Sequence, residues 1–489
     1  MVKTILPGVA ITPAREPEGN NFKVARPDCS LWGMLEDTIA AIATPVGEGG
    51  LAVIRISGKD ALTTTDRCFA PAGKNSIRPS ATQSHTILYG HVVREGRNVD
   101  EVLVSVMHAP RTFTREHVVE ITCHGGVLSA KLVLDAVLAS GARAAEPGEF
   151  TRRAFLNGRI DLVQAEAVAD LIHSRTELAL RAANEQLEGK LSKRINALRD
   201  QLMATLAHIE AHIDFPDEDI APDTRAQLIA RLEGGLRFIE ELLRTANEGQ
   251  VLRRGVRAAI IGRPNAGKSS LLNQLLGHDR AIVSAIPGTT RDTIEETANI
   301  RGIPVVFIDT AGLREAQDEI EMEGIRRSRK SLEKAELILH VFDASEPITT
   351  AEEQFLAELS GKKRILVLNK VDLPRRLVFP AAFNGEALEV CCLTGQGIEQ
   401  LKDALKELVW AGEIRAEMLE TMINSRHQNA LVRGREAIER TLEALRSEQT
   451  LELVALDLRI GLNAVGEIVG KTATEDLLDS IFSQFCIGK

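Results

Sequence analysis

Cysteine is scarce in this chain and is never spaced as a metal-binding site would require. There are six cysteines in 489 residues, with no Cys-x-x-Cys pair and no Cys/His cluster. Such a pattern is typical of reduced thiols in a cytosolic protein, so neither a disulfide framework nor a zinc site is expected. The six are Cys29, Cys68, Cys123, Cys391, Cys392 and Cys486.

Long hydrophobic runs are also missing. No apolar run approaches the roughly 18–20 residues that span a bilayer. Near the N-terminus, Pro7 and Pro13 interrupt the short apolar stretches, which excludes the apolar core of a signal peptide. Acidic residues in the same segment, such as Glu16 and Glu18, argue against a transit peptide. We therefore expect a cytoplasmic protein without a membrane anchor.

Aromatic residues and net positive charge are both lacking. Aromatics make up 3% of the chain and the formal net charge is −10. The charge argues against a generally basic surface that coats nucleic acid, and the few rings argue against extensive stacking on unpaired bases. A local basic groove remains compatible with this net charge and this aromatic content.

Length and periodicity predict several domains. A chain of 489 residues corresponds to roughly two to four units. The predicted architecture is an α/β domain inserted into an all-α helical domain, preceded by an α+β N-terminal domain. Insertion is plausible because the termini of a domain often lie close together. The expected units are a mobile extension 1–34, an α+β domain 35–155, helical segments 156–254 and 413–489, and the α/β domain 255–412.

The first two ordered units carry distinct patterns. Alternating apolar residues predict strands at 51–56, 86–93, 102–107 and 118–122, and a helix follows at 127–139. From residue 187 to 213, apolar residues recur every three or four positions, which predicts a long amphipathic helix. A second helix at 223–248 repeats the stripe, and the two are expected to pack antiparallel.

A phosphate-binding loop follows an apolar strand at 256–261. The sequence Gly262-Arg-Pro-Asn-Ala-Gly-Lys-Ser269 matches the P-loop pattern, and an apolar helix follows it. Its glycines allow backbone N–H groups to approach the phosphates. Lys268 is expected to reach the β- and γ-phosphates and Ser269 to ligate Mg²⁺. The predicted binding residues of the loop are Asn265, Ala266, Gly267, Lys268, Ser269 and Ser270.

Two further motifs are spaced as in a GTPase. A strand at 305–308 precedes Asp309-Thr310-Ala311-Gly312, in which Asp309 would support Mg²⁺ and the Gly312 N–H would sense the γ-phosphate. Between this motif and the P-loop lies a candidate switch loop, where Thr290 is the predicted second hydroxyl ligand of Mg²⁺. The switch residues assigned to the nucleotide site are Ser284, Ala285, Ile286, Pro287, Gly288, Thr289 and Thr290.

The base-recognition motif indicates guanine. After a strand at 365–368, the segment Asn369-Lys370-Val371-Asp372 places a carboxylate that accepts both the N1 and N2 protons of guanine. Adenine would leave that charge unpaired. A last loop, Cys391-Cys392-Leu393, stands where a Ser-Ala-Lys sequence is usual, and its backbone N–H groups are expected to contact the guanine O6.

The usual catalytic groups are absent from the sequence. Leu313 occupies the position of the water-orienting glutamine of Ras-like enzymes, and no arginine finger is identifiable. Several carboxylates follow at 315–323, most of which would only be solvated. The Asn265 carbonyl oxygen, with carbonyls of the 284–289 loop, provides a candidate site for a monovalent cation that would replace the charge of the finger.

Segments outside the nucleotide motifs resemble the MnmE (TrmE) family of bacterial and organellar tRNA-modification GTPases. The resemblance runs from about Asp37 to Lys489 and leaves residues 1–34 uncovered. It implies a potassium-stimulated GTPase that works as a homodimer, with K⁺ held by Asn265, Ser284, Ile286 and Thr289 and with Glu321 orienting water. The segments that carry it are 43–50, 147–150, 155–162, 214–218 and 485–489.

With the nucleotide motifs, the predicted fold class is an α/β P-loop GTPase domain inserted into an all-α helical domain. The same resemblance implies that the preceding α+β N-terminal domain resembles folate-binding domains and serves one-carbon chemistry. It assigns 5-formyl- or methylene-tetrahydrofolate to Arg55, Glu120, Arg159 and Lys489, and the modification chemistry to Cys486. Arg159 stands where a lysine is common, which keeps a cation but alters its reach. The partners implied are tRNA and an FAD-containing flavoprotein (MnmG or GidA), which together with this chain add a carboxymethylaminomethyl or aminomethyl group to C5 of the wobble uridine.

Alternatives remain at the C-terminus and for the whole chain. Cys486 lies four residues from the end, but Gly488 and the terminal lysine do not fit a prenylation signal; a buried structural thiol is the other reading. Thr472 and Glu475 are spaced as a capping box for the last helix. The rival function is an RNA-binding ribosome-assembly GTPase without modification chemistry. A membrane-remodelling GTPase is disfavoured because no basic amphipathic segment is visible.

Overall fold

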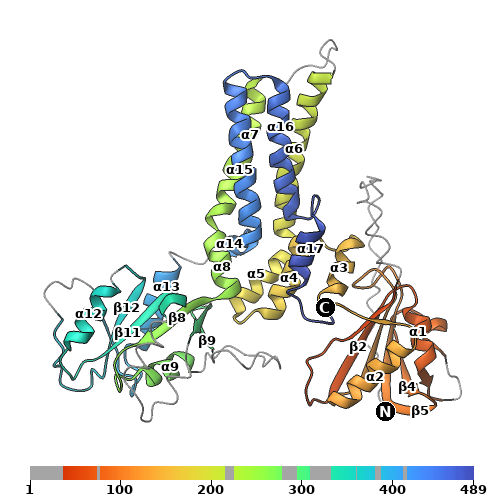
Figure 1. Ribbon diagram of the computed structural model, residues 1–489, viewed down its shortest axis with the longest axis horizontal. Coiled ribbons are helices and arrows are strands. Elements are labelled where there is room, and N and C mark those ends of the chain that lie inside the picture. The colour runs from red at the N-terminus through yellow and green to blue at the C-terminus, as the bar shows by residue number, and fades with distance from the viewer. Residues whose placement is uncertain are drawn as a thin grey trace, which may run out of the picture.

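A computed structural model of the chain shows three architectural parts (Figure 1). The structure describes residues 37–73, 77–214, 225–277, 295–308, 332–359, 361–379, 387–410 and 416–489. The predicted extension 1–34 lies outside these residues. Among the helices of the described ranges, none is long and apolar enough to cross a membrane.

The N-terminal part is a seven-stranded mixed sheet in the order β3-β4-β5-β6-β2-β1-β7. Helices α1 (Ala61–Cys68) and α2 (Val127–Ala139) pack against it and bury Ile54, Val104 and Ile121. The predicted strands are all present, but β5 begins five residues early because Glu95 and Gly96, both with positive φ, form a tight hairpin turn. The strands are β1 (Ile39–Ile42), β2 (Leu51–Ser57), β3 (Phe69–Pro71), β4 (Thr86–Arg94), β5 (Arg97–Met107), β6 (Val118–His124) and β7 (Arg143–Ala144).

Long helices form an arm above the other parts (Figure 1). Their apolar stripes meet in one core that includes Leu198, Leu232, Ile438 and Leu458. The prediction of one helix over 223–248 was wrong, because the helix is interrupted at Thr245. The Thr245 hydroxyl donates hydrogen bonds to the carbonyls of Leu242 and Thr421. The arm comprises α6 (Lys190–Asp214), α7 (Arg225–Arg244), α15 (Ser425–Arg446) and α16 (Leu451–Ile468), and α8 (Ala246–Arg254) follows the break.

Shorter helices join the arm to the N-terminal sheet. The last helix packs on α3 and α4 through Ala154, Leu162, Leu478 and Phe482. Its N-cap is Thr474, which accepts a hydrogen bond from Leu477 N–H, so the predicted capping box with Thr472 was wrong. The Thr472 hydroxyl instead bonds the Asn463 carbonyl. These helices are α3 (Glu149–Leu156), α4 (Leu162–His173), α5 (Glu177–Leu187), α14 (Ala416–Glu420) and α17 (Glu475–Phe482).

The third part is an α/β domain placed in sequence between α8 and α14, which confirms the predicted insertion. Its sheet has the order β13-β12-β11-β8-β10-β9, with β9 antiparallel to β10 and the other pairs parallel. Strand β8 is flanked by β10 and β11, so the strand order reverses beside it. The elements are β8 (Val256–Ile261), α9 (Lys268–Leu276), β9 (Glu296–Ile300), β10 (Ile303–Phe307), β11 (Leu337–Asp343), α12 (Thr350–Glu358), β12 (Arg364–Asn369), β13 (Ala387–Glu389) and α13 (Ile398–Val409).

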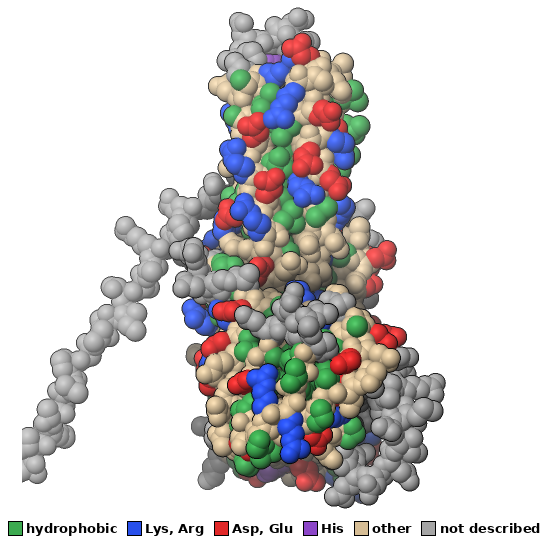
Figure 2. All heavy atoms as spheres, turned by 90° about the vertical axis from the view of Figure 1, so that its left-hand side faces the viewer, with side chains coloured by type: hydrophobic (Ala, Val, Ile, Leu, Met, Phe, Trp, Pro, Cys, Tyr) green, Lys and Arg blue, Asp and Glu red, His purple; other side chains and the backbone are tan. Residues whose placement is uncertain are grey.

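Acidic and basic side chains are interspersed along the arm on the face seen in Figure 2. Several join neighbouring helices, including Arg446 with Glu233 and Arg440 with Asp457. Pairs this exposed each contribute about 0–1 kcal/mol. The arm is therefore held mainly by its apolar core.

Candidate functional site

The P-loop turn is shaped by two glycines at the carboxyl end of β8. Gly262 has φ +147° and Gly267 has φ +96°, both in the region that favours glycine. A Cβ on Gly262 would lie 2.2 Å from the Val341 carbonyl oxygen, and one on Gly267 would lie 2.0 Å from the Asn369 Nδ2 atom. The backbone thus closely approaches β11 and the end of β12, and α9 begins directly after the turn with its free N–H groups toward the loop.

Lys268, the predicted phosphate-binding lysine, lies over this loop. Its Nζ donates to the Arg263 carbonyl at 2.8 Å, which keeps the ammonium across the turn that would surround the phosphates. Burial lowers the pKa of Lys268 from its usual value. Asn265 has φ +62°, a left-handed conformation that asparagine adopts more readily than most residues.

The predicted base-recognition residues lie beside the P-loop. The side chain of Asn369, 2% exposed, donates to the Ala266 carbonyl at 2.9 Å and accepts from the Cys392 N–H at 3.2 Å. The Cys391 thiol lies 3.2 Å from Asp372 Oδ1. Leu393 is 86% exposed, and so adds nothing to the core of this loop. One asparagine therefore connects the loop for the phosphates with both segments for the base.

Sequence reasoning missed Asp343, the last residue of β11. Its carboxylate lies 2.6 Å from Lys370 Nζ and also accepts hydrogen bonds from the Ser345 N–H and hydroxyl. These contacts hold its pKa below the usual value, against the effect of burial. Lys370 itself has φ +67°. The sequence could have indicated Asp343, because this aspartate ends an apolar segment that is predicted to be a buried strand.

Many predicted nucleotide and cation ligands lie outside the described residues, so their placement stays a prediction. Of the Mg²⁺ ligands, Ser269 is the second residue of α9, and of the K⁺ ligands only Asn265 is described. Those outside are Ser284, Ala285, Ile286, Pro287, Gly288, Thr289, Thr290, Asp309, Thr310, Ala311, Gly312 and Glu321.

A second cluster brings together residues from the two ends of the chain. Arg55 on β2 and Glu120 on β6 are paired across the strands, with Nε and Oε1 2.8 Å apart. The same guanidinium donates to the Gly488 carbonyl at 3.0 Å and lies 5.8 Å from the centroid of the Phe150 ring. Burial and nearby Arg55 lower the pKa of Lys489. Arg55, Glu120 and Lys489 are thus gathered at one place.

The C-terminal tail is fixed against the sheet. Ile487 forms an isolated β-bridge with Pro147, and Gly488, at φ +93°, would place a Cβ 2.5 Å from the Ile42 carbonyl oxygen. Cys486 is exposed, which excludes the reading of a buried structural thiol. Next to this contact, Ile42 and Thr44 help to line a cavity of about 310 Å³.

Arg159, the fourth predicted folate residue, is held by the loop between β5 and β6. Its Nη1 donates to the Thr112 carbonyl at 2.8 Å, and the guanidinium lies 5.6 Å from the centroid of the Phe113 ring. Phe113 packs against the small cluster that contains Phe150. The rings beneath Arg55 and Arg159 therefore belong to one apolar cluster.

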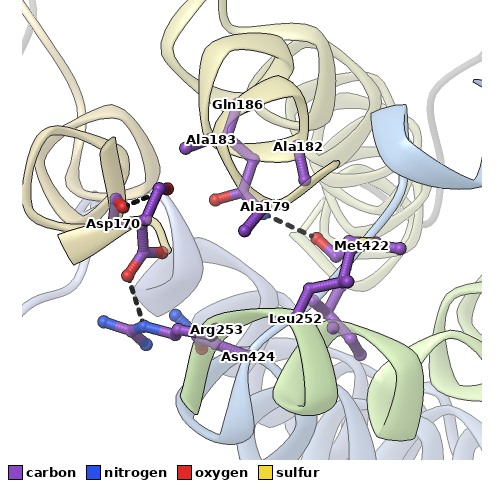
Figure 3. A pocket seen from close by; sticks show the side chains of 12 residues that line it. Asp170, Ala179, Ala182, Ala183, Gln186, Leu252, Arg253, Met422 and Asn424 are labelled. Carbon is purple, nitrogen blue, oxygen red and sulfur yellow. Dashed lines mark hydrogen bonds and ion pairs between the residues drawn. The ribbon is translucent and has the colours of Figure 1, made fainter. Parts of the chain in front are cut away.

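At the junction of the arm and the α/β domain, a pair of opposite charges lies beside a cavity of about 30 Å³ (Figure 3). Asp170 on α4 pairs with Arg253 in the last turn of α8, which leads into β8. Burial and nearby Glu166 raise the pKa of Asp170 to about 6, against the effect of Arg253. One turn earlier, Glu166 is bound by Arg426 and His427, each at 2.8 Å.

Comparison with known proteins covers nearly the whole chain. The family model of the MnmE helical domain matches residues 162–486, and that of the TrmE N-terminus, described as a GTP-binding protein, matches residues 38–159. Among solved structures, the G domain of the FeoB iron transporter of T. maritima matches 31% of this chain and 98% of its own, at 25% identity and a TM-score of 0.22.

Two curated relatives carry the assignment. The tRNA modification GTPase MnmE of Geobacillus kaustophilus (strain HTA426) is 49% identical over 461 residues, which cover 93% of this chain and 99% of the relative. That of Geobacter metallireducens is 49% identical over 459 residues, which cover 93% and 100%. Together with the P-loop and base-recognition geometry, these matches show that this chain belongs to the MnmE family of tRNA modification GTPases.

Proposed function

We propose that this GTPase is stimulated by K⁺ and acts as a homodimer with an FAD-containing flavoprotein of the MnmG (GidA) type. Together they add a carboxymethylaminomethyl or aminomethyl group to C5 of the wobble uridine in certain tRNAs. The one-carbon unit comes from 5-formyl- or methylene-tetrahydrofolate bound to this chain. GTP hydrolysis drives association of the G domains and does not itself transfer carbon.

The observation that carries this proposal is the cluster at the C-terminal tail. Arg55 and Glu120 lie beside Gly488 and Lys489, and the exposed Cys486 thiol is in the same short tail. Glu120 provides acceptors for pterin N–H groups, and the guanidinium groups suit folate carboxylates. A GTPase that only binds RNA has no use for this constellation.

The proposed GTPase mechanism depends on the P-loop and on a bound cation that replaces the missing arginine finger. GTP would lie on the backbone between Gly262 and Ser269, with Mg²⁺ held by Ser269 and Thr290. K⁺ bound by Asn265 and the 284–289 loop would supply the positive charge of an arginine finger. Glu321 would orient the water. The left-handed turn at Asn265 supports this proposal because the residue stands within the phosphate-binding turn.

The decisive experiment is nucleoside analysis of tRNA from a strain that lacks its own member of the family. Complementation with this chain restores the modified wobble uridine, whereas complementation with Cys486→Ser does not. Failure of the unaltered chain to restore it would favour the ribosome-assembly alternative. Two assays address the GTPase: turnover is faster in K⁺ than in Na⁺, and Glu321→Ala abolishes hydrolysis while GTP still binds. Equal rates in the two salts, or normal turnover of the variant, would remove these assignments.

A further inference from the structure

Three exposed arginines lie in, or are bonded to, the turn at residues 111–115 between β5 and β6. The Thr112 oxygen accepts from the Arg159 guanidinium at 2.8 Å and from the Arg115 backbone N–H at 3.4 Å. Arg111 precedes Thr112 directly in the chain, so its Cα lies about 3.8 Å from that of Thr112. Arg111 and Arg115 belong to this turn, Arg159 lies between α3 and α4, and all three are exposed.

These guanidinium groups lack acidic partners. Within the part of the chain that the structure describes, no carboxylate lies within 4.0 Å of Arg111, Arg115 or Arg159, whereas nearby Arg152 and Arg153 are both ion-paired. Mutual repulsion would be relieved by an anionic ligand with several charges.

The cluster is rigidly built. Arg115 has φ +60°, a costly conformation for this residue type that tends to persist at functional sites. Its Nη1 donates to the Asn157 carbonyl at 3.0 Å, and the Asn157 side chain donates to the Thr114 carbonyl at 2.7 Å. Two loops from separate segments thus brace each other and fix where the arginines emerge.

We propose that Arg111 and Arg115 bind the γ-linked polyglutamate tail of the folate. This inference rests on the proposed function, in which the guanidinium groups of Arg55 and Arg159 suit the folate carboxylates. Arg159 and Arg55 lie over rings of one apolar cluster, and Arg111 and Arg115 belong to the turn that binds Arg159. A chain of glutamates carries one carboxylate per added residue, which matches a short row of guanidinium groups.

The other polyanion available to this protein is the phosphate backbone of tRNA. A tRNA surface would be expected to spread basic residues over a wide area. Here Arg111 and Arg115 lie four residues apart in one turn, and that turn binds a predicted folate residue directly. The compact arrangement favours a short, flexible acidic chain.

The test compares 5-formyltetrahydrofolate with one and with five glutamates, by calorimetric titration of the full-length chain. The pentaglutamate is expected to bind about 5- to 20-fold more tightly, since a few exposed charge pairs each contribute modestly. Arg111→Ala and Arg115→Asn reduce this ratio toward one; asparagine tolerates the left-handed backbone at 115. Arg97→Ala, an exposed arginine at the far hairpin, removes the same charge and leaves the ratio unchanged.

The outcomes separate the inference from the function on which it rests. Equal affinity for the two ligands would overturn the tail site and leave the folate proposal intact. Failure of both ligands to bind would overturn both. If the two variants weaken tRNA binding while the ratio of folate affinities persists, the ligand of the arginines is phosphate and the proposal is wrong. Higher salt is expected to shrink the ratio in the unaltered chain.

Discussion

Asn369 and Ala266 are joined by a 2.9 Å hydrogen bond, in which the side-chain amide of the base motif donates to a carbonyl of the P-loop. The same side chain accepts from the Cys392 backbone, so one buried amide connects three loops of the nucleotide site. The geometry of the loops therefore depends on a residue that need not touch the nucleotide.

Asn369→Ala is expected to weaken GTP and GDP binding alike, by about 10- to 100-fold. The change leaves a buried carbonyl and a buried N–H without partners, which costs about 1–3 kcal/mol. Because the lost contacts are remote from the γ-phosphate, the two nucleotides lose similar affinity. Titration with a fluorescent analogue of each measures this, with Asn273→Ala on the exposed side of α9 as the control. Loss for GTP alone would contradict the connecting role.

Gly267→Ala is expected to reduce nucleotide affinity by at least about 10-fold, since a residue with Cβ at φ +96° is strained by about 1–3 kcal/mol. The added Cβ would also lie 2.0 Å from Asn369 Nδ2 and push apart the two loops. Gly361→Ala is the matched control, because a Cβ there meets nothing within 4 Å. The same titration measures both variants. Comparable nucleotide affinity in Gly267→Ala and Gly361→Ala would show that the P-loop turn accommodates the added Cβ.

Sequence patterns predicted the elements whose conformation is determined by residues close together in the chain. The strand, turn and helix around Gly267 were predictable because their glycine positions and apolar periodicity occur within one short stretch of sequence. The bond from Arg55 to Gly488 was not, because 433 positions separate its partners and no periodic pattern relates them. The break at Thr245 likewise depends on a tertiary contact, to the Thr421 carbonyl. Resemblance to a family, and not spacing, brought Arg55 and Lys489 into one predicted site.

Asp170→Asn is expected to remove a loss of stability that the protein suffers as the pH rises. The pKa of Asp170 is about 6 in the folded protein, against an ordinary value of 3.8. A raised pKa means that the folded state holds the proton more tightly. Its contribution to stability is therefore complete below about pH 4 and is lost as the pH rises through 6. The full loss corresponds to about 3 kcal/mol.

Thermal unfolding at pH 4.5 and 7.5 tests this expectation. Between pH 4.5 and 7.5, the change in melting temperature is more positive in Asp170→Asn than in the unaltered chain. Asp200→Asn removes the same charge from a side chain that is 74% exposed on the arm, and leaves this change as it is in the unaltered chain. If Asp170→Asn also leaves it the same, burial and Glu166 do not disfavour the Asp170 carboxylate.

Gly488→Ala is expected to separate folate binding from nucleotide binding. Alanine is disfavoured at φ +93°, and its Cβ would lie 2.5 Å from the Ile42 carbonyl oxygen, so the tail must move. Arg55 then loses a charge-assisted hydrogen bond, a loss of about 1.5–3 kcal/mol, and 5-formyltetrahydrofolate affinity falls about 10- to 100-fold. GTP affinity is unchanged because the P-loop shares no contact with the tail. Gly234→Ala on α7 controls for the substitution itself, and unaltered folate affinity in Gly488→Ala would exclude the tail from the site.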